Sequence, residues 1–229
     1  LDLSLGAFYG KSNNNNAAQG AGSPFFSLMF VEPHIDLKGP NDDGSPYRAN
    51  PEDINTSSNA TNPLYYLANT DRSTQRNRYT GTFKARYRIF DWLVGEGNYN
   101  FDGESENYMT SQPRGYLNRT GVATPGNLQR QSVSGRSTNA GLTLTSTRNL
   151  TSDIVNTTKA AFVYEGQIRD TFNVLASAFT VSRTPEFGAV TGQILPYSSN
   201  ITVKNRNTFL VSQFDIKDRY IVDGLIRQD

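Results

Sequence analysis

The chain has 229 residues, enough for one or two domains, with 22 basic and 21 acidic side chains and a net charge of +1. This balance argues against a nucleic-acid partner, and the absence of cysteine excludes disulfide scaffolds, thiolate metal sites and cysteine nucleophiles. Hydrophobic residues make up only 36% of the chain, yet aromatic residues reach 11%. This combination is typical of strands that bury one face and are joined by polar loops.

Alternation of apolar and polar residues predicts seven β-strands, whereas the helical period fails nearly everywhere. The first predicted strand covers residues 1–11 and is followed by three hairpins. Their arms are residues 79–89 with 93–102, 136–147 with 153–166, and 206–216 with 219–229. The predicted tight turns lie at 88–92, 147–153 and 216–219.

The connections between these hairpins are long and polar, at about residues 12–76, 104–135 and 167–205. Loops of more than about 12–15 residues are unusual in compact soluble domains. Short turns alternating with long loops, and strands of about 9–11 residues, are typical of transmembrane β-barrels. A soluble β-sandwich shows the same alternation within its strands, so the loops and the strand lengths are what favour a barrel.

The number of strands leads to a second expectation. Single-chain bacterial outer-membrane barrels have an even number of strands, from about 8 upward, so seven strands do not close by themselves. We therefore expect residues 1–229 to be part of one larger barrel domain with long extracellular loops.

Several segments resemble the SusC/RagA type of TonB-dependent outer-membrane transporter. The segment 62–67, Asn-Pro-Leu-Tyr-Tyr-Leu, resembles the one that precedes a barrel strand in this family. The strand–turn–strand ending in Trp92-Leu93, the strand end at Phe101-Asp102 and the run 218–229 are also similar, in matching order. The resemblance implies a barrel of roughly 22 strands around a plug and import of oligosaccharides or peptides. It also implies a SusD-like lipoprotein and the TonB–ExbB–ExbD system as partners, and a place in the bacterial outer membrane. No plug domain or TonB box occurs in this sequence.

The two faces of the predicted strands carry different side chains. Lys or Arg on the lipid face at the bilayer midplane costs about 2–4 kcal/mol, so the charged face is expected to line the lumen and the aromatic face to contact lipid. The expected outward residues are Phe83, Tyr87, Tyr99, Leu142, Phe162 and Val222. The expected lumen residues, contacting plug or substrate, are Lys84, Arg86, Arg88, Glu96, Asn98, Asp102 and Arg227.

The sequence offers little for catalysis. Glu104 and Glu106 are interpreted as solvated loop charges, because glycosidases place their two carboxylates across a pocket. Residues 41–44 have an oxygen-rich composition but lack the ligand spacing of a calcium loop. We therefore expect no enzyme activity, no catalytic or metal-binding residues and no cofactor. The leading hypothesis is part of a SusC-like importer, and the alternative is a soluble or surface-exposed carbohydrate-binding module.

Overall fold

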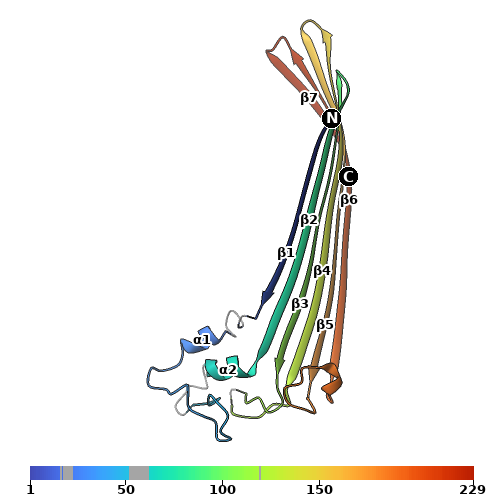
Figure 1. Ribbon diagram of the computed structural model, residues 1–229. Coiled ribbons are helices and arrows are strands. Elements are labelled where there is room, and N and C mark those ends of the chain that lie inside the picture. Colours follow the sequence, from blue (N-terminus) through green and yellow to red (C-terminus); the bar gives the residue numbers. More distant parts are fainter. Residues whose placement is uncertain (16, 18–22, 52–61, 119) are drawn as a thin grey trace.

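Seven antiparallel strands form one sheet in which every strand neighbours the next along the chain (Figure 1). The computed structural model describes residues 1–15, 17, 23–51, 62–118 and 120–229. The strands are β1 (Asp2–Asn14), β2 (Asp71–Phe90), β3 (Leu93–Gln112), β4 (Asn127–Thr151), β5 (Ile154–Ser177), β6 (Ile194–Ile216) and β7 (Tyr220–Gln228). The prediction of an all-β, antiparallel fold with seven strands is confirmed.

The three predicted tight turns are present and lie at one end of the sheet (Figure 1). Only two residues separate β2 from β3 and β4 from β5, and three separate β6 from β7. The last turn contains Lys217 and Asp218, both with positive φ angles, which Asp tolerates better than most residues. The other three connections lie at the opposite end, as expected.

The predicted strand lengths and loop limits are wrong. Strands β2 to β6 contain 20 to 25 residues, and the later two connections shrink to 113–126 and 178–193. The added halves of β2 and β4, residues 71–78 and 127–135, carry mainly polar side chains on both faces, so the alternation that marks a half-buried strand is missing there. In β5 the alternation continues through Ile168, Phe172 and Val174, so this extension had a signal in the sequence. Backbone hydrogen bonds between strands do not depend on this alternation, and the ladder continues without it.

The connection 15–70 contains two short helices, α1 (Pro24–Leu28) and α2 (Pro63–Asn69), which the strand pattern did not predict. Each begins at a side-chain cap followed by proline: Ser23 accepts a hydrogen bond from the Phe25 N–H, and Asn62 accepts one from the Leu64 N–H. These are the residue types that satisfy a first helical turn. Among the described residues, neither helix is long and apolar enough to cross a bilayer.

Buried side chains gather at the loop end of the sheet. Leu128, Ala176 and Phe179 pack together there, and Phe187 of the short helix η2 (Phe187–Ala189) lies against them. Along the rest of the sheet, aromatic rings of one strand cover glycines of its neighbour. A Cβ at Gly103 would clash with the Tyr79 ring, and one at Gly81 would clash with Phe101. Glycine at these two positions therefore allows the rings to lie flat against the sheet.

Candidate functional site: the polar face of the sheet

The strand register separates the side chains into two faces. One row across the sheet joins Leu5, Phe83, Tyr99, Ala140 and Tyr164, each directly opposite the next. This row and the alternate residues along each strand define the aromatic face. The neighbouring row joins Ser4, Lys84, Asn98, Gly141 and Val163 and belongs to the polar face. Successive side chains of a strand point to opposite faces, so each face is fixed over all seven strands.

All seven predicted lumen residues lie on the polar face. Six of them are on β2 and β3, where Arg86 Nε lies 3.3 Å from Glu96 Oε1 and Asp102 accepts hydrogen bonds from Arg78 at 2.8 and 3.1 Å. Asn98 donates to Asn139 at 3.4 Å. Exposed ion pairs of this kind are worth only about 0–1 kcal/mol, so their effect is to hold the charges in place more than to stabilise the fold.

The structure does not bring Arg227 together with the other predicted residues. It lies on β7, where it forms an ion pair with Asp229, and its guanidinium lies 5.2 Å from the centre of the Phe209 ring. Lys84 and Arg88 form no ion pair with any residue that the structure describes. Whether these side chains face a lumen remains a prediction.

Two ion pairs were missed because the predicted strands were too short. Arg76 pairs with Glu106 directly across β2 and β3, and Arg78 reaches diagonally to Asp102. The interpretation of Glu104 and Glu106 as loop charges is therefore wrong, since both lie within β3. Residues 71–78 are polar on both faces, so the alternation of apolar and polar residues gave no signal for this part of β2.

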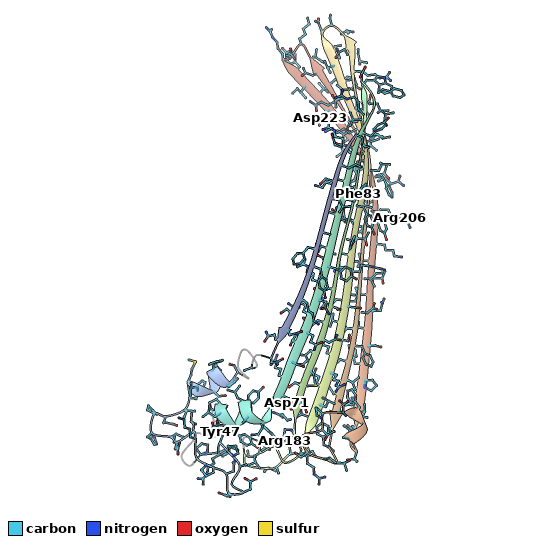
Figure 2. The ribbon with its side chains drawn as sticks, in the orientation of Figure 1. Tyr47, Asp71, Phe83, Arg183, Arg206 and Asp223 are labelled. Atoms are coloured by element: carbon cyan, nitrogen blue, oxygen red, sulfur yellow. The ribbon has the colours of Figure 1, made fainter. Side chains whose placement is uncertain are left out.

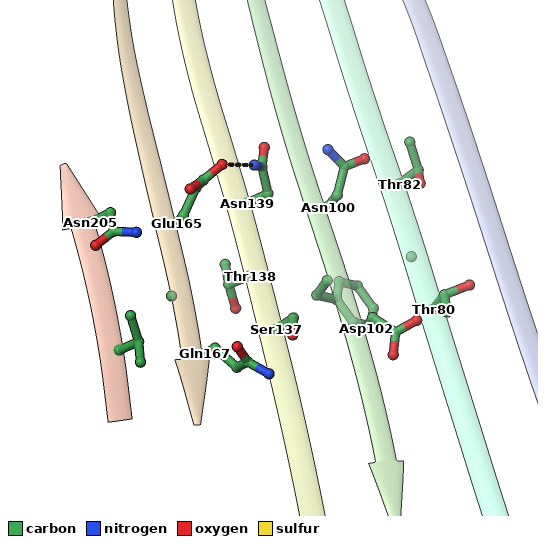
Figure 3. Close-up of a pocket in the computed structure, with 14 residues that line it drawn as sticks. Thr80, Thr82, Asn100, Asp102, Ser137, Thr138, Asn139, Glu165, Gln167 and Asn205 are labelled. Atoms are coloured by element: carbon green, nitrogen blue, oxygen red, sulfur yellow. Dashed lines mark hydrogen bonds between the residues drawn. The ribbon is translucent and has the colours of Figure 1, made fainter. Parts of the chain in front are cut away.

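A groove of about 470 Å³ crosses the polar face from β2 to β6 (Figure 3). One row of its lining is continuous in the register: Thr82, Asn100, Asn139, Glu165 and Asn205. Glu165 accepts a hydrogen bond from Asn139 at 3.4 Å and has no cationic partner among the described residues. The groove thus offers amide donors and acceptors and carboxylate acceptors, and its lining contains no Lys or Arg.

The apolar band on the aromatic face ends at nearly the same register level on the first five strands. Moving toward the loop end, the first charged or amide side chain on β1 is Lys11, opposite Asn77, and on β5 it is Asp170, whose row also reaches β2 at Asn77. On β7 it is Gln228, whose row reaches β2 at Ala85. The band is therefore shortest on the last strands of the sheet.

The connections at the loop end are joined by a buried asparagine. The Asn62 side chain is fully buried, and its amide donates to the carbonyl oxygens of Leu37 at 2.9 Å and Arg48 at 2.7 Å while its oxygen caps α2. Asn62 therefore fixes residues 37–48 to the helix that leads into β2. Three residues further on, the Tyr65 hydroxyl accepts a 2.7 Å hydrogen bond from the Leu117 N–H of the next connection.

Replacing Asn62 is expected to loosen these connections. Asn62→Ala removes both hydrogen bonds to these part-buried carbonyl groups, which costs about 1–3 kcal/mol. Asn62→Asp keeps the helix cap but faces the same carbonyls with a carboxylate, so it is expected to be at least as damaging. Hydrogen exchange of residues 37–48 in the complete protein measures both. Asn69→Ala is the control, since Asn69 lies on the same helix and, among the described residues, donates to the Tyr65 carbonyl within that helix. Unchanged exchange in both Asn62 variants would contradict this role.

Tyr116 is expected to titrate at unusually high pH. Burial, followed by the nearby Tyr65 and Tyr66, raises the pKa of its hydroxyl from 10.0 to about 12. The folded chain thus holds this proton more tightly than the unfolded chain, so stability of the loop end should fall as pH rises from about 10 to about 12 and should be unaffected below that range. The difference in phenolate absorbance between the parent and Tyr116→Phe measures the midpoint, and a value near 10 would contradict it.

These features together define an antiparallel sheet with one apolar and one polar face, the arrangement of a β-barrel wall. Comparison with solved structures agrees with this class. The chain is similar to a structure of the RagAB peptide transporter, with a TM-score of 0.72, 13% identity, and coverage of 98% of this chain and 26% of that chain. It is also similar to the RagAB peptide importer in its "open-open" state, with a TM-score of 0.68, 12% identity, and coverage of 98% of this chain and 25% of that chain. For the "closed-closed" state the TM-score is 0.64 and the identity 11%, with the same coverage of 98% and 25%.

This likeness concerns the fold alone. The chain spans about a quarter of the length of the transporter chains it matches, and the identities of 11–13% are low. No family model and no curated protein sequence matches it. The fold is therefore similar to a section of the barrel in these neighbours, and a shared fold does not by itself imply a shared activity.

Proposed function

We propose that this chain forms part of the barrel wall of a TonB-dependent importer in the bacterial outer membrane, of the SusC/RagA type, carrying peptides or oligosaccharides. The observation that carries the proposal is the apolar band on the aromatic face, which no second layer of the described residues covers. A band of exposed Leu, Phe and Tyr side chains on one face of an antiparallel sheet matches the lipid-facing surface of a transmembrane barrel. The exposed fractions of Leu5 (80%) and Leu142 (55%) agree, because such side chains need a lipid environment.

In this proposal the polar face lines the lumen. Lys84, Arg86, Arg88, Glu96, Asn98, Asp102 and Arg227 contact a plug or the substrate in a water-filled interior, where charges are tolerated. Further strands, up to roughly 22, complete the barrel together with the plug. A SusD-like lipoprotein covers the loop end, and the TonB–ExbB–ExbD system supplies energy. The RagAB neighbours are described as peptide transporters and importers, which supports a peptide substrate.

The soluble carbohydrate-binding alternative lacks an observation in its favour. A β-sandwich buries the apolar face of one sheet against a second sheet. The described residues form a single sheet whose aromatic face has no covering layer. The long strands also exceed the usual 3–10 residues of strands in globular proteins.

Electrophoresis of the complete protein tests the proposal. A closed barrel keeps its fold in detergent, so the unboiled protein should migrate faster than the boiled one and should fractionate with outer membranes. Deletion of the gene should then abolish growth on the transported nutrient, with peptides and oligosaccharides supplied in parallel as sole sources. A detergent-independent, soluble protein without heat-modifiable migration would refute the barrel proposal.

A further inference from the structure

Three cations lie together on the aromatic face just beyond the apolar band. Arg136 is on β4, and Lys204 and Arg206 are on β6. The register places Arg206 opposite Tyr164, Lys204 opposite Gly166, and Arg136 opposite Ile168, so only β5 separates the two flanking strands. Arg206 lies in the row of Phe83, and both are labelled in Figure 2. Two strand spacings amount to about 10 Å, so one group of ligands reaches all three side chains.

These cations have no partner among the described residues. All three side chains are exposed, and none forms an ion pair or hydrogen bond with another described residue. On the polar face, Arg76, Arg78 and Arg86 each have a carboxylate within 4 Å, whereas Lys84 and Arg88 do not. The acidic residue on the same face beside them is Asp170, which accepts a hydrogen bond from Asn200. The cluster therefore carries an excess of positive charge that the chain does not neutralise.

Tyr164 places an aromatic ring at the centre of the cluster. Its hydroxyl leans over Gly166, 2.8 Å from where a Cβ would stand, and so toward the level of Lys204. On the side of this row that is nearer the turns, the same face continues with Phe162 and Leu142, which lie directly opposite one another. From the turn end toward the loop end, this face thus changes from apolar side chains to a tyrosine and then to unpaired cations. A membrane changes in the same order, from acyl chains through the interface to charged headgroups.

We propose that Arg136, Lys204 and Arg206 form a binding site for the phosphate groups of anionic lipid in the outer leaflet of the membrane. This inference rests on the proposed function, because it needs the aromatic face to contact lipid. We assign a lipid phosphate and not a free anion because the three cations lie at the edge of the apolar band. A lipid whose phosphate binds these cations can therefore extend its acyl chains over Phe162 and Leu142 on the same surface.

The test uses the complete protein purified in detergent, with lipid A as the phosphorylated probe and phosphatidylcholine as the zwitterionic one. The variant is the triple substitution Arg136→Gln, Lys204→Gln and Arg206→Gln. Each cation near an anionic lipid surface contributes about fivefold, so loss of three should weaken lipid A binding by roughly 100-fold at low salt. The matched control is the double substitution Lys217→Gln and Arg219→Gln at the turn end. Lys217 there already pairs with Asp153 at 3.7 Å. The control variant should bind lipid A with an affinity within about twofold of the parent.

The assignment is wrong if the triple variant binds lipid A as tightly as the parent, or if the parent binds phosphatidylcholine as tightly as lipid A. It is also wrong if inorganic phosphate competes as strongly as lipid A, which indicates a site for free anions. Competition by poly-glutamate would overturn it as well and indicates a site for an acidic protein. Heat-modifiable migration is measured on the same samples. If the parent shows it and the triple variant binds lipid A normally, the lipid site is wrong while the barrel proposal stands. If the parent lacks it, the proposed function itself fails.

Discussion

Residues 1–229 expressed by themselves should give aggregated material and no heat-modifiable monomer in detergent. Strand β1 pairs only with β2, and β7 covers only Thr208–Ile216 of β6, so the described sheet has two open edges. Each unsatisfied backbone group in a lipid environment costs several kcal/mol, and an open edge also recruits other chains. The proposed barrel removes both edges by pairing them with further strands.

The control is the complete protein that contains this segment, expressed and extracted in parallel. It should remain monodisperse in detergent and migrate faster before boiling than after it. Size-exclusion chromatography and unboiled electrophoresis of both samples give the comparison. A stable monomer of residues 1–229 with protected amide groups on β1 and β7 would refute the idea that the wall is incomplete.

A single arginine on the aromatic face should destabilise the complete protein strongly. Leu142 lies in mid-band on β4, between Gly97 and Phe162, and is 55% exposed without neighbouring lipid. Leu142→Arg therefore places a charge in the acyl chains, at a cost of about 2–4 kcal/mol. Reversible denaturant unfolding in phospholipid bilayers measures the loss.

Thr143→Arg is the matched control, because it introduces the same side chain one residue away on the opposite face. Thr143 lies opposite Glu96 and lines a second hollow of the polar face together with Asp2 and Glu96, where water and carboxylates accommodate a cation. Its cost should stay below about 1 kcal/mol. If the two variants lose equal stability, or if Thr143→Arg is the more damaging, the assignment of the two faces is wrong.

The local pattern was sufficient to predict the faces and the turns. Alternation at Tyr79 to Ile89 and at residues 93–102 correctly grouped Phe83 with Tyr99 and Lys84 with Asn98, because the side-chain period of a strand is two wherever one face is apolar. The three turns were predictable for the same reason: the alternation stops and resumes within a few residues.

Long-range pairing alone decided the rest. The loop halves of β2 and β4 are largely polar on both faces, so their length emerges only when neighbouring strands are aligned. The Arg76–Glu106 ion pair and the row from Thr82 to Asn205 depend on the same alignment. The role of Asn62 likewise depends on carbonyl groups 14 and 25 residues away in the chain. The level at which the apolar band ends on each strand is a property of six strand pairings together. Sequence thus determined which side chains share a face, because that is local stereochemistry, whereas the tertiary register determined which of them meet, because that depends on the stagger between strands.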